Sequence, residues 1–143
     1  MSEKVMKVIA VSTEVPDQVG MAAGMAAALR ERRIGLKAVW SRSSDSGMTT
    51  VISIPEKIEE LRALAAEERR SIEEIPMVWL EGPDEIGALY PFLAKVGEAR
   101  INIQAMISLA VAGSFAGVFE FADEAAVDRV VALLEGERMP SKA

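Results

Sequence analysis

The chain has 143 residues, of which 27% are charged and 50% are hydrophobic, so it can bury the core of one ordinary domain or of two small ones. Sixteen Lys and Arg against 22 Asp and Glu give a net charge of −6, which argues against binding to nucleic acid through a basic surface. The chain has no Cys and no His, which excludes disulfides, thiolate nucleophiles, imidazole bases and metal sites built on nitrogen or sulfur ligands.

No apolar run approaches the roughly 18–20 residues that cross a bilayer, and residues 1–7 show no signal-peptide pattern. We therefore expect a cytoplasmic protein with neither a membrane nor a nucleic acid as partner.

The first half of the chain predicts five elements. Val5–Val11 is a short run rich in Val and Ile and predicts a buried strand. Asp17 stands where a helix N-cap belongs, and apolar residues recur at spacings of three and four from Val19 to Leu29, which predicts a helix. Residues 34–41 and 48–54, separated by turn residues, predict a hairpin. A last helix opens with Pro55 at its N1 position and buries a stripe of three residues: Ile58, Leu61 and Leu64.

The second half repeats this order. Met77–Leu80 predicts a strand, and Asp84 predicts the N-cap of a helix from Glu85 to about Ala99. Residues 101–109 alternate in polarity, with the apolar residues on one side and the polar residues on the other, as in a strand. A turn at 112–114 and a strand over 115–121 complete the second hairpin. We expect Asp123 to be the N-cap of the last helix and Gly136 to be its C-terminal cap. The expected buried stripe of this helix is Val127, Val130, Val131 and Leu134.

Pro91 falls inside the helix predicted for residues 85–99, four residues after Gly87. A proline there cannot donate to the Gly87 carbonyl, so we expect that carbonyl to be free and the helix to bend.

The two halves are copies of each other. Shifting the sequence by 67 residues aligns residues 14–68 with 81–135 without a gap, with 14 identities in the 55 positions. This indicates a tandem duplication, with a first repeat over residues 1–71 and a second over 72–143. The predicted order is strand, helix, strand, strand, helix, twice, in an α+β fold.

Two motifs recur in the repeats. Pro83-Asp84-Glu85-Ile86-Gly87 stands at a strand-to-helix turn, and Ile101-Asn102-Ile103 opens a strand after the helix. The first repeat keeps Pro16-Asp17-Gln18-Val19-Gly20 but has Ile34-Gly35-Leu36 at the second motif. These motifs resemble those of the ACT domain, a small ferredoxin-like module that binds amino acids. The resemblance covers nearly the whole chain and implies a ferredoxin-like βαββα(β) module twice, with antiparallel sheets and helices on one face.

The resemblance also implies a regulatory or sensing role without catalysis or cofactor. In the family, an amino acid binds where the loop after the first strand of one domain meets the second strand of its neighbour. The expected ligand is therefore a free amino acid or a similar small metabolite, at an interface between repeats or between subunits of a homodimer. The candidate ligand-binding residues are Asp17, Gln18, Val19, Gly20, Asp84, Glu85, Ile86, Gly87, Asn102 and Gln104.

The chemistry of the glycine turns agrees with this expectation. Unpaired N–H groups in a first helical turn and the positive helix pole suit a carboxylate, and neither Gly20 nor Gly87 has a side chain to block its approach. The alternative is that each glycine only permits tight packing of helix on sheet.

Asn102 offers both a donor and an acceptor, enough to hold the carboxylate or the amine of an amino acid. The alternative is a turn residue with a left-handed backbone. Because Gly35 stands at this position in the first repeat, we expect two unequal sites, the better one formed by residues 17–20 facing Asn102.

The fourth strand of the usual module is hard to find in either repeat, because residues 71–74 and 137–143 are short or polar. Without it, the first strands would keep unpaired backbone groups at an edge. We expect the two first strands to pair with each other in one fused sheet, or with another subunit, and the protein to be a dimer.

Four other functions have weaker support. An RNA-recognition fold needs exposed aromatic residues and a basic surface. An enzyme would have to rest on Asp84 with Glu85 or on Lys37, and a hard cation on Asp17 or Asp84 without a calcium-type loop. The strongest alternative is a module that binds no ligand and serves protein association, for which the eight Met residues would suit an adaptable surface.

Overall fold

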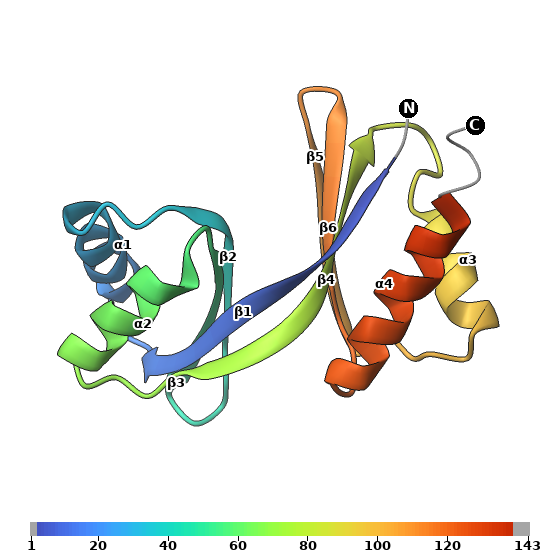
Figure 1. Ribbon diagram of the computed structural model, residues 1–143. Coiled ribbons are helices and arrows are strands. Elements are labelled where there is room, and N and C mark those ends of the chain that lie inside the picture. The colour runs from blue at the N-terminus through green and yellow to red at the C-terminus, as the bar shows by residue number, and fades with distance from the viewer. Residues whose placement is uncertain (1–2, 139–143) are drawn as a thin grey trace. The chain divides into compact units, whose positions relative to one another are not determined.

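The computed structural model describes residues 3–138. Both halves of the chain form strand, helix, strand, strand, helix, in the predicted order (Figure 1). The first half contains β1 (Lys4–Pro16), α1 (Met21–Glu31), β2 (Leu36–Ser43), β3 (Met48–Pro55) and α2 (Ile58–Glu67). The second half contains β4 (Glu73–Pro83), α3 (Tyr90–Glu98), β5 (Ala105–Val111), β6 (Ser114–Glu120) and α4 (Glu124–Arg138).

The chain divides into two compact units, and their limits cut through the two longest strands. The N-terminal unit is Ile9–Ile75, and the C-terminal unit combines Met1–Val8 with Pro76–Ala143. Residues 4–8 of β1 therefore belong to the C-terminal unit, and residues 73–75 of β4 belong to the N-terminal unit. The repeat boundary between residues 71 and 72 concerns the duplication and stays a prediction.

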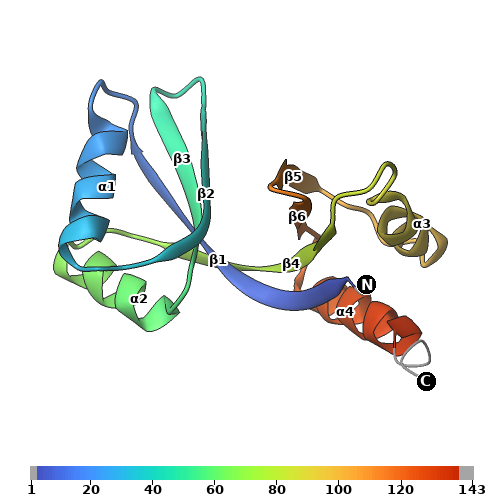
Figure 2. The same ribbon diagram turned by 90° about the horizontal axis from the view of Figure 1, so that it is seen from above.

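The N-terminal unit has the strand order β2-β3-β1, with antiparallel pairing, and both of its helices cover the same face of these strands (Figure 2). The segment before and at the start of β4 is attached to this unit by side chains. Thr13 Oγ1 donates to the Ser71 carbonyl at 3.0 Å, and Arg62 of α2 donates to both Glu74 carboxylate oxygens at 2.8 Å.

The C-terminal unit has the order β4-β6-β5, also antiparallel, with α3 and α4 on one face (Figure 2). The first residues of β1, which neighbours β4 in the strand order, complete this unit. Val5 is 5% exposed and shares a core cluster with Val78 and Leu80, and Lys7 pairs with Glu124 and Asp128 of α4.

These attachments account for the fourth strand that the sequence did not reveal. Both first strands are longer than predicted: β1 has 13 residues and β4 has 11. In each unit, the position of the fourth ferredoxin-like strand is taken by residues of the other repeat's first strand, 4–8 in one unit and 73–75 in the other. The extra length of the strands is what makes this exchange possible.

The core of the C-terminal unit is densely packed around an aromatic pair. The rings of Phe92 and Phe119 lie 4.4 Å apart between centroids and are tilted by 39°, and both side chains are fully buried. Three of the four residues predicted for the stripe of α4 are confirmed, because Val127 and Val130 are completely buried and Leu134 is 8% exposed, whereas Val131 is only partly buried. These side chains share one hydrophobic cluster with Val96, Ile101, Phe115 and Phe121.

The N-cap role predicted for Asp17 and Asp84 is wrong. The N-caps are Gly20 for α1 and Leu89 for α3, and neither helix has a side-chain cap. Each Asp is held through its backbone instead. The Asp17 amide donates to the Gly47 carbonyl at 3.0 Å, and the Asp84 amide donates to that of Gly113 at 2.9 Å. The hairpin turn of the same unit therefore positions each aspartate.

The bend and the free carbonyl expected around Pro91 are also wrong. Helix α3 begins at Tyr90, so Pro91 lies in the first turn, where a helix needs no N–H. The Gly87 carbonyl accepts a hydrogen bond from the Tyr90 amide at 3.0 Å.

Other predicted boundaries differ as well. Pro55 ends β3 instead of opening α2, and α4 continues through Gly136 to Arg138. Asp123 is confirmed as a cap, because its Oδ1 accepts from the Ala126 amide at 2.9 Å. Strand β5 begins only at Ala105, and the residues of its predicted apolar side, Ala105, Ile107 and Leu109, are exposed.

Candidate functional site

The loops after β1 and β4 each contain a glycine with a left-handed backbone. Gly20 has φ +87° and Gly87 has φ +78°, both left-handed, a region that costs other residues about 1–2 kcal/mol. A Cβ added to either glycine would meet nothing within 4 Å. The glycines are therefore required by the backbone conformation, and the alternative that they permit tight packing of helix on sheet is wrong.

Backbone donors are open beside Gly20. The Met21 amide donates to the Gln18 carbonyl at 3.2 Å and the Gly24 amide to the Gly20 carbonyl at 3.0 Å. Within the part of the chain that the structure describes, the amides of Val19, Gly20, Ala22 and Ala23 donate no hydrogen bond. They lie at the N-terminus of α1, where the helix dipole favours an anion.

The second loop is equally open. The Ala88 amide donates to the Glu85 carbonyl at 3.0 Å, while the amides of Ile86 and Gly87 donate no hydrogen bond among the described residues. The side chains of Val19 and Ile86 are fully exposed, so neither shields the backbone of its loop from a ligand.

The ten candidate residues fall into both units and are all exposed. The residues from Asp17 to Gly20 belong to the N-terminal unit. The residues from Asp84 to Gly87 belong to the C-terminal unit, as do Asn102 and Gln104, which precede β5. The pairing of the first loop with Asn102 therefore joins residues of different units and stays a prediction.

Asn102 lies in the segment that precedes β5. Its backbone is not left-handed, so the alternative that it serves a left-handed turn is wrong. Its side chain makes no hydrogen bond within residues 3–138, whereas the Gln104 amide donates to the Glu120 carbonyl at 2.8 Å. The Asn102 amide group is thus available to a ligand.

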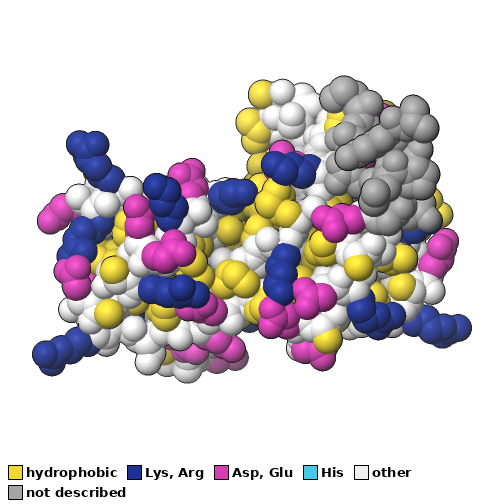
Figure 3. All heavy atoms as spheres, viewed as in Figure 1, with side chains coloured by type: hydrophobic (Ala, Val, Ile, Leu, Met, Phe, Trp, Pro, Cys, Tyr) yellow, Lys and Arg dark blue, Asp and Glu magenta, His cyan; other side chains and the backbone are white. Residues whose placement is uncertain are grey.

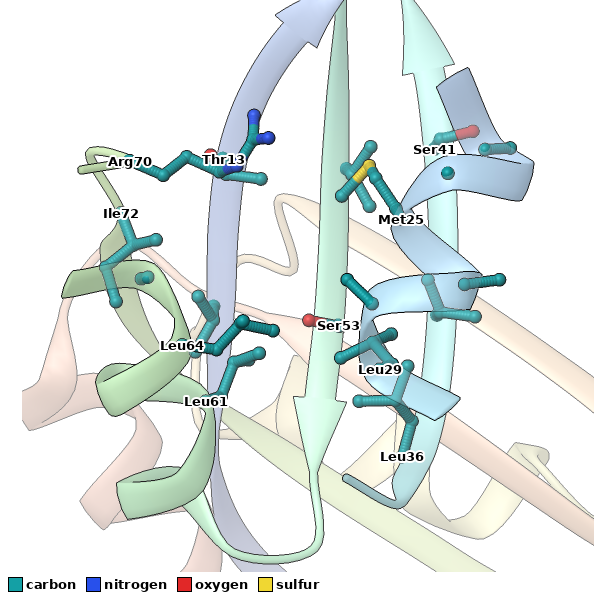
Figure 4. Close-up of a pocket in the computed structure, with 18 of the residues that line it drawn as sticks. Thr13, Met25, Leu29, Leu36, Ser41, Ser53, Leu61, Leu64, Arg70 and Ile72 are labelled. Atoms are coloured by element: carbon teal, nitrogen blue, oxygen red, sulfur yellow. The ribbon is translucent and has the colours of Figure 1, made fainter. Parts of the chain in front are cut away.

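The sequence did not predict a cavity inside the N-terminal unit. This cavity, of about 560 Å³, lies between α1, α2 and the helix-facing side of the sheet (Figure 4). Figure 4 shows Met25 and Leu29 reaching it from α1, and Leu61 and Leu64 from α2. No residue of α1 is buried, in contrast to α3, which buries Phe92 and Val96.

The cavity exists because the two repeats differ by one residue in their hairpins. Pro16 pairs with Met48, but the equivalent Pro83 pairs with Ser114, so the third strands align with a shift of 66 instead of the predicted 67. Val11 then pairs with Ser53 where Val78 pairs with Phe119. The first repeat therefore has Ser53 at the position where the second repeat has Phe119 of its aromatic pair.

At two further core positions, the first repeat has a residue that fills less space than its counterpart in the second repeat, or one that is polar. By the shift of 67, Met25 takes the place of Phe92 and Thr13 takes the place of Leu80. Equivalent hydrogen bonds at the ends of α1 and α3 support this alignment. The Ile34 amide donates to the Leu29 carbonyl at 2.9 Å, and the Ile101 amide donates to the Val96 carbonyl at 3.1 Å. An alignment of the core positions with one gap would have revealed the cavity.

Ser53 places a polar atom in this apolar space. The residue is 9% exposed, and its hydroxyl makes no hydrogen bond with any residue that the structure describes. A buried hydroxyl without a partner costs about 1–3 kcal/mol. Thr13, the other buried polar residue, is satisfied by its bond to Ser71.

Ion pairs hold the edges of the N-terminal unit. Arg32, which follows α1, donates to Glu67 at the end of α2 with Nη1 to Oε2 at 2.6 Å, and this hydrogen bond lowers the pKa of Glu67. The hydrogen bonds from Arg62 lower the pKa of Glu74 in the same way. Figure 3 shows acidic and basic side chains interspersed over the visible face of both units, without a continuous basic patch there.

Among residues 3–138, no three Asp or Glu side chains come together as metal ligands would. In the same range, no helix combines the length and the apolar character that a membrane span requires.

Each unit has the ferredoxin-like fold, and the chain is a tandem pair of such units in the manner of ACT domains. Solved structures share this fold. Protein BT0572 from Bacteroides thetaiotaomicron matches with a TM-score of 0.81 and 16% identity, over 94% of this chain and 90% of that one. The regulatory subunit of aspartate kinase from Thermus thermophilus, in a ligand-free form, matches with a TM-score of 0.59 and 15% identity, over 94% and 95%.

The regulatory subunit of aspartate kinase from Thermus flavus has a TM-score of 0.54 and 20% identity, over 94% of this chain and 97% of that one. No protein-family model and no curated protein matches the chain. At these identities the likeness establishes the fold, and it confirms the resemblance to ACT domains at that level.

Proposed function

We propose that this protein is a non-catalytic regulatory module that binds a free amino acid at its glycine turns. The observation that carries the proposal is the repeated loop in which a left-handed glycine leaves backbone amides open at Gly20 and again at Gly87. Such amides recognise a carboxylate without any charged side chain. A second domain, from the same chain or from another copy in a homodimer, would supply Asn102 for the other end of the ligand.

The fold supports a regulatory role, because two of the solved structures with this fold are regulatory subunits of aspartate kinase. The composition supports a non-catalytic role, since the chain has neither His nor Cys. An enzyme would have to rely on carboxylates and lysine, and the candidate carboxylates Asp17 and Asp84 are both exposed to water.

A thermal-shift screen of the twenty amino acids tests the proposal. A ligand at about 100 times its Kd adds roughly 2.7 kcal/mol of stability, which raises Tm by about 5–10 °C for a chain of this size. The shift should shrink in Asn102→Ala, and it should persist in the control Glu98→Ala, an exposed position of the same unit. If none of the amino acids raises Tm, the proposal fails.

Strand β5 favours a second candidate function, protein association. It is the last strand in the order of its sheet, and its apolar side chains are open: Met106 is 46% exposed, Ile107 39%, Leu109 58% and Val111 64%. An open edge with such side chains is suited to pairing with another chain. Sedimentation of the wild type and of Leu109→Lys would test this candidate, which expects a dimer that the charge dissociates.

A further inference from the structure

We propose that the cavity of the N-terminal unit is a second binding site, for a neutral and largely apolar small molecule with one hydrogen-bonding group. It differs from the proposed amino acid site, because none of the ten candidate residues lines it, although Met21 and Ala22, which follow Gly20, do. It therefore does not depend on amino acid binding.

The size of the cavity fits a small molecule. Its volume of about 560 Å³ lies within the range of about 300–1,000 Å³ that is typical of ligand pockets. The cavity is partly open to solvent, because Val39, one of its lining residues, is 57% exposed. The C-terminal unit fills the equivalent space with Phe92 and Phe119.

The walls select an apolar molecule. Aliphatic side chains line most of the cavity, from both helices and from all three strands, among them Val11, Val39 and Val51. The two charged residues at its border are paired with each other, since Arg70 Nε lies 3.5 Å from Glu68 Oε1. A bound molecule consequently meets no unpaired charge among the residues that line the cavity, which argues against a charged ligand.

The hydroxyl of Ser53 defines the polar part of the ligand. This buried hydroxyl has no hydrogen-bond partner within the described chain. It lies on β3, among the side chains that line the cavity (Figure 4). A ligand that hydrogen-bonds to it removes the cost of burying the group unpaired. An apolar core evolved only for stability would have no reason to place serine where the other repeat has phenylalanine.

Fluorescence titration with N-phenyl-1-naphthylamine, a neutral apolar probe with one N–H, tests this site in the full chain. The wild type should bind the probe saturably. The variant Met25→Phe with Ser53→Phe restores the aromatic pair of the other unit and should bind about tenfold more weakly or worse, because the space is filled. Ser43→Phe, the same change at an exposed β2 position outside the cavity, is the matched control and should bind as the wild type does.

Ser53→Ala separates the polar contact from the volume. It should lower the affinity for the probe roughly three- to tenfold, which corresponds to the loss of one hydrogen bond. The affinity for naphthalene, which has no hydrogen-bonding group, should stay unchanged. If the filled variant does not fold by circular dichroism, Ala26→Trp on α1 replaces it, because Ala26 lines the cavity but is exposed. Absence of saturable binding to the wild type, equal affinity in the filled variant, or no effect of Ser53→Ala would overturn the proposal.

Discussion

Two glycines four residues apart should respond to the same substitution with opposite signs. Gly20 has φ +87° and an empty surrounding, so Gly20→Ala introduces no clash but forces alanine into the left-handed region, at a cost of about 1–2 kcal/mol. Gly24 lies within α1, has an ordinary φ and is equally unobstructed. Gly24→Ala should therefore stabilise the unit by about 0.5–1 kcal/mol, because alanine is the better helix former. The two variants should therefore differ by about 1.5–3 kcal/mol.

Urea unfolding measures this difference in the unit concerned. Trp40 belongs to the N-terminal unit and Trp79 to the C-terminal unit, so a Trp79→Phe background assigns the fluorescence to Trp40. The urea midpoint should fall for Gly20→Ala and rise for Gly24→Ala relative to that background. Equal midpoints for the two variants would refute the assignment of Gly20 to a left-handed turn that only glycine adopts cheaply.

Three further predictions concern packing and charge. Phe92→Ala should lower the free energy of unfolding by about 3–5 kcal/mol, because it empties a packed core. Met25→Ala, at the equivalent position beside the cavity, should lower it far less. Similar losses of stability in urea would contradict the difference in packing between the two units. Thr13→Val should cost about 1 kcal/mol through the lost bond to Ser71, and an unchanged urea midpoint would show that this bond contributes nothing. Arginine lowers the pKa values of Glu67 and Glu74, so their stabilisation is present above the unfolded pKa of about 4.3 and is lost as the pH falls through the folded values. Between pH 7 and about pH 3, the urea midpoint of Glu67→Gln/Glu74→Gln should fall less than that of the wild type, and an equal fall would contradict the ion pairs.

The sequence predicted the fold well, because the repeat and the hydrophobic periods are local signals. It missed the ends of the strands for a physical reason. Residues 12–14 and 73–74 are polar, and only their neighbours in the structure make them strand: Thr13 bonds to Ser71, and Glu74 to Arg62. The exchange of strand ends between repeats was therefore invisible to a pattern read along the chain.

The helix starts were missed because distant contacts decide them. Asp17 and Asp84 have the composition of N-caps, but a hairpin glycine about 30 residues away, at Gly47 or Gly113, accepts the amide of each. The glycine turns could be found from the Pro-Asp-x-x-Gly motif alone. The ungapped alignment of the repeats hid the cavity, because a one-residue difference between the hairpins decides whether Ser53 or Ile52 occupies the place of Phe119.

The most direct test of amino acid binding at the glycine turns is a titration of the ¹⁵N-labelled full chain with each amino acid, followed by backbone NMR. The account predicts that one amino acid moves the amide resonances of Val19, Gly20, Ile86 and Gly87 saturably, and that the effect weakens in Asn102→Ala. If an amino acid binds and these amides stay in place while others move, or if none of the twenty moves them, the account is contradicted.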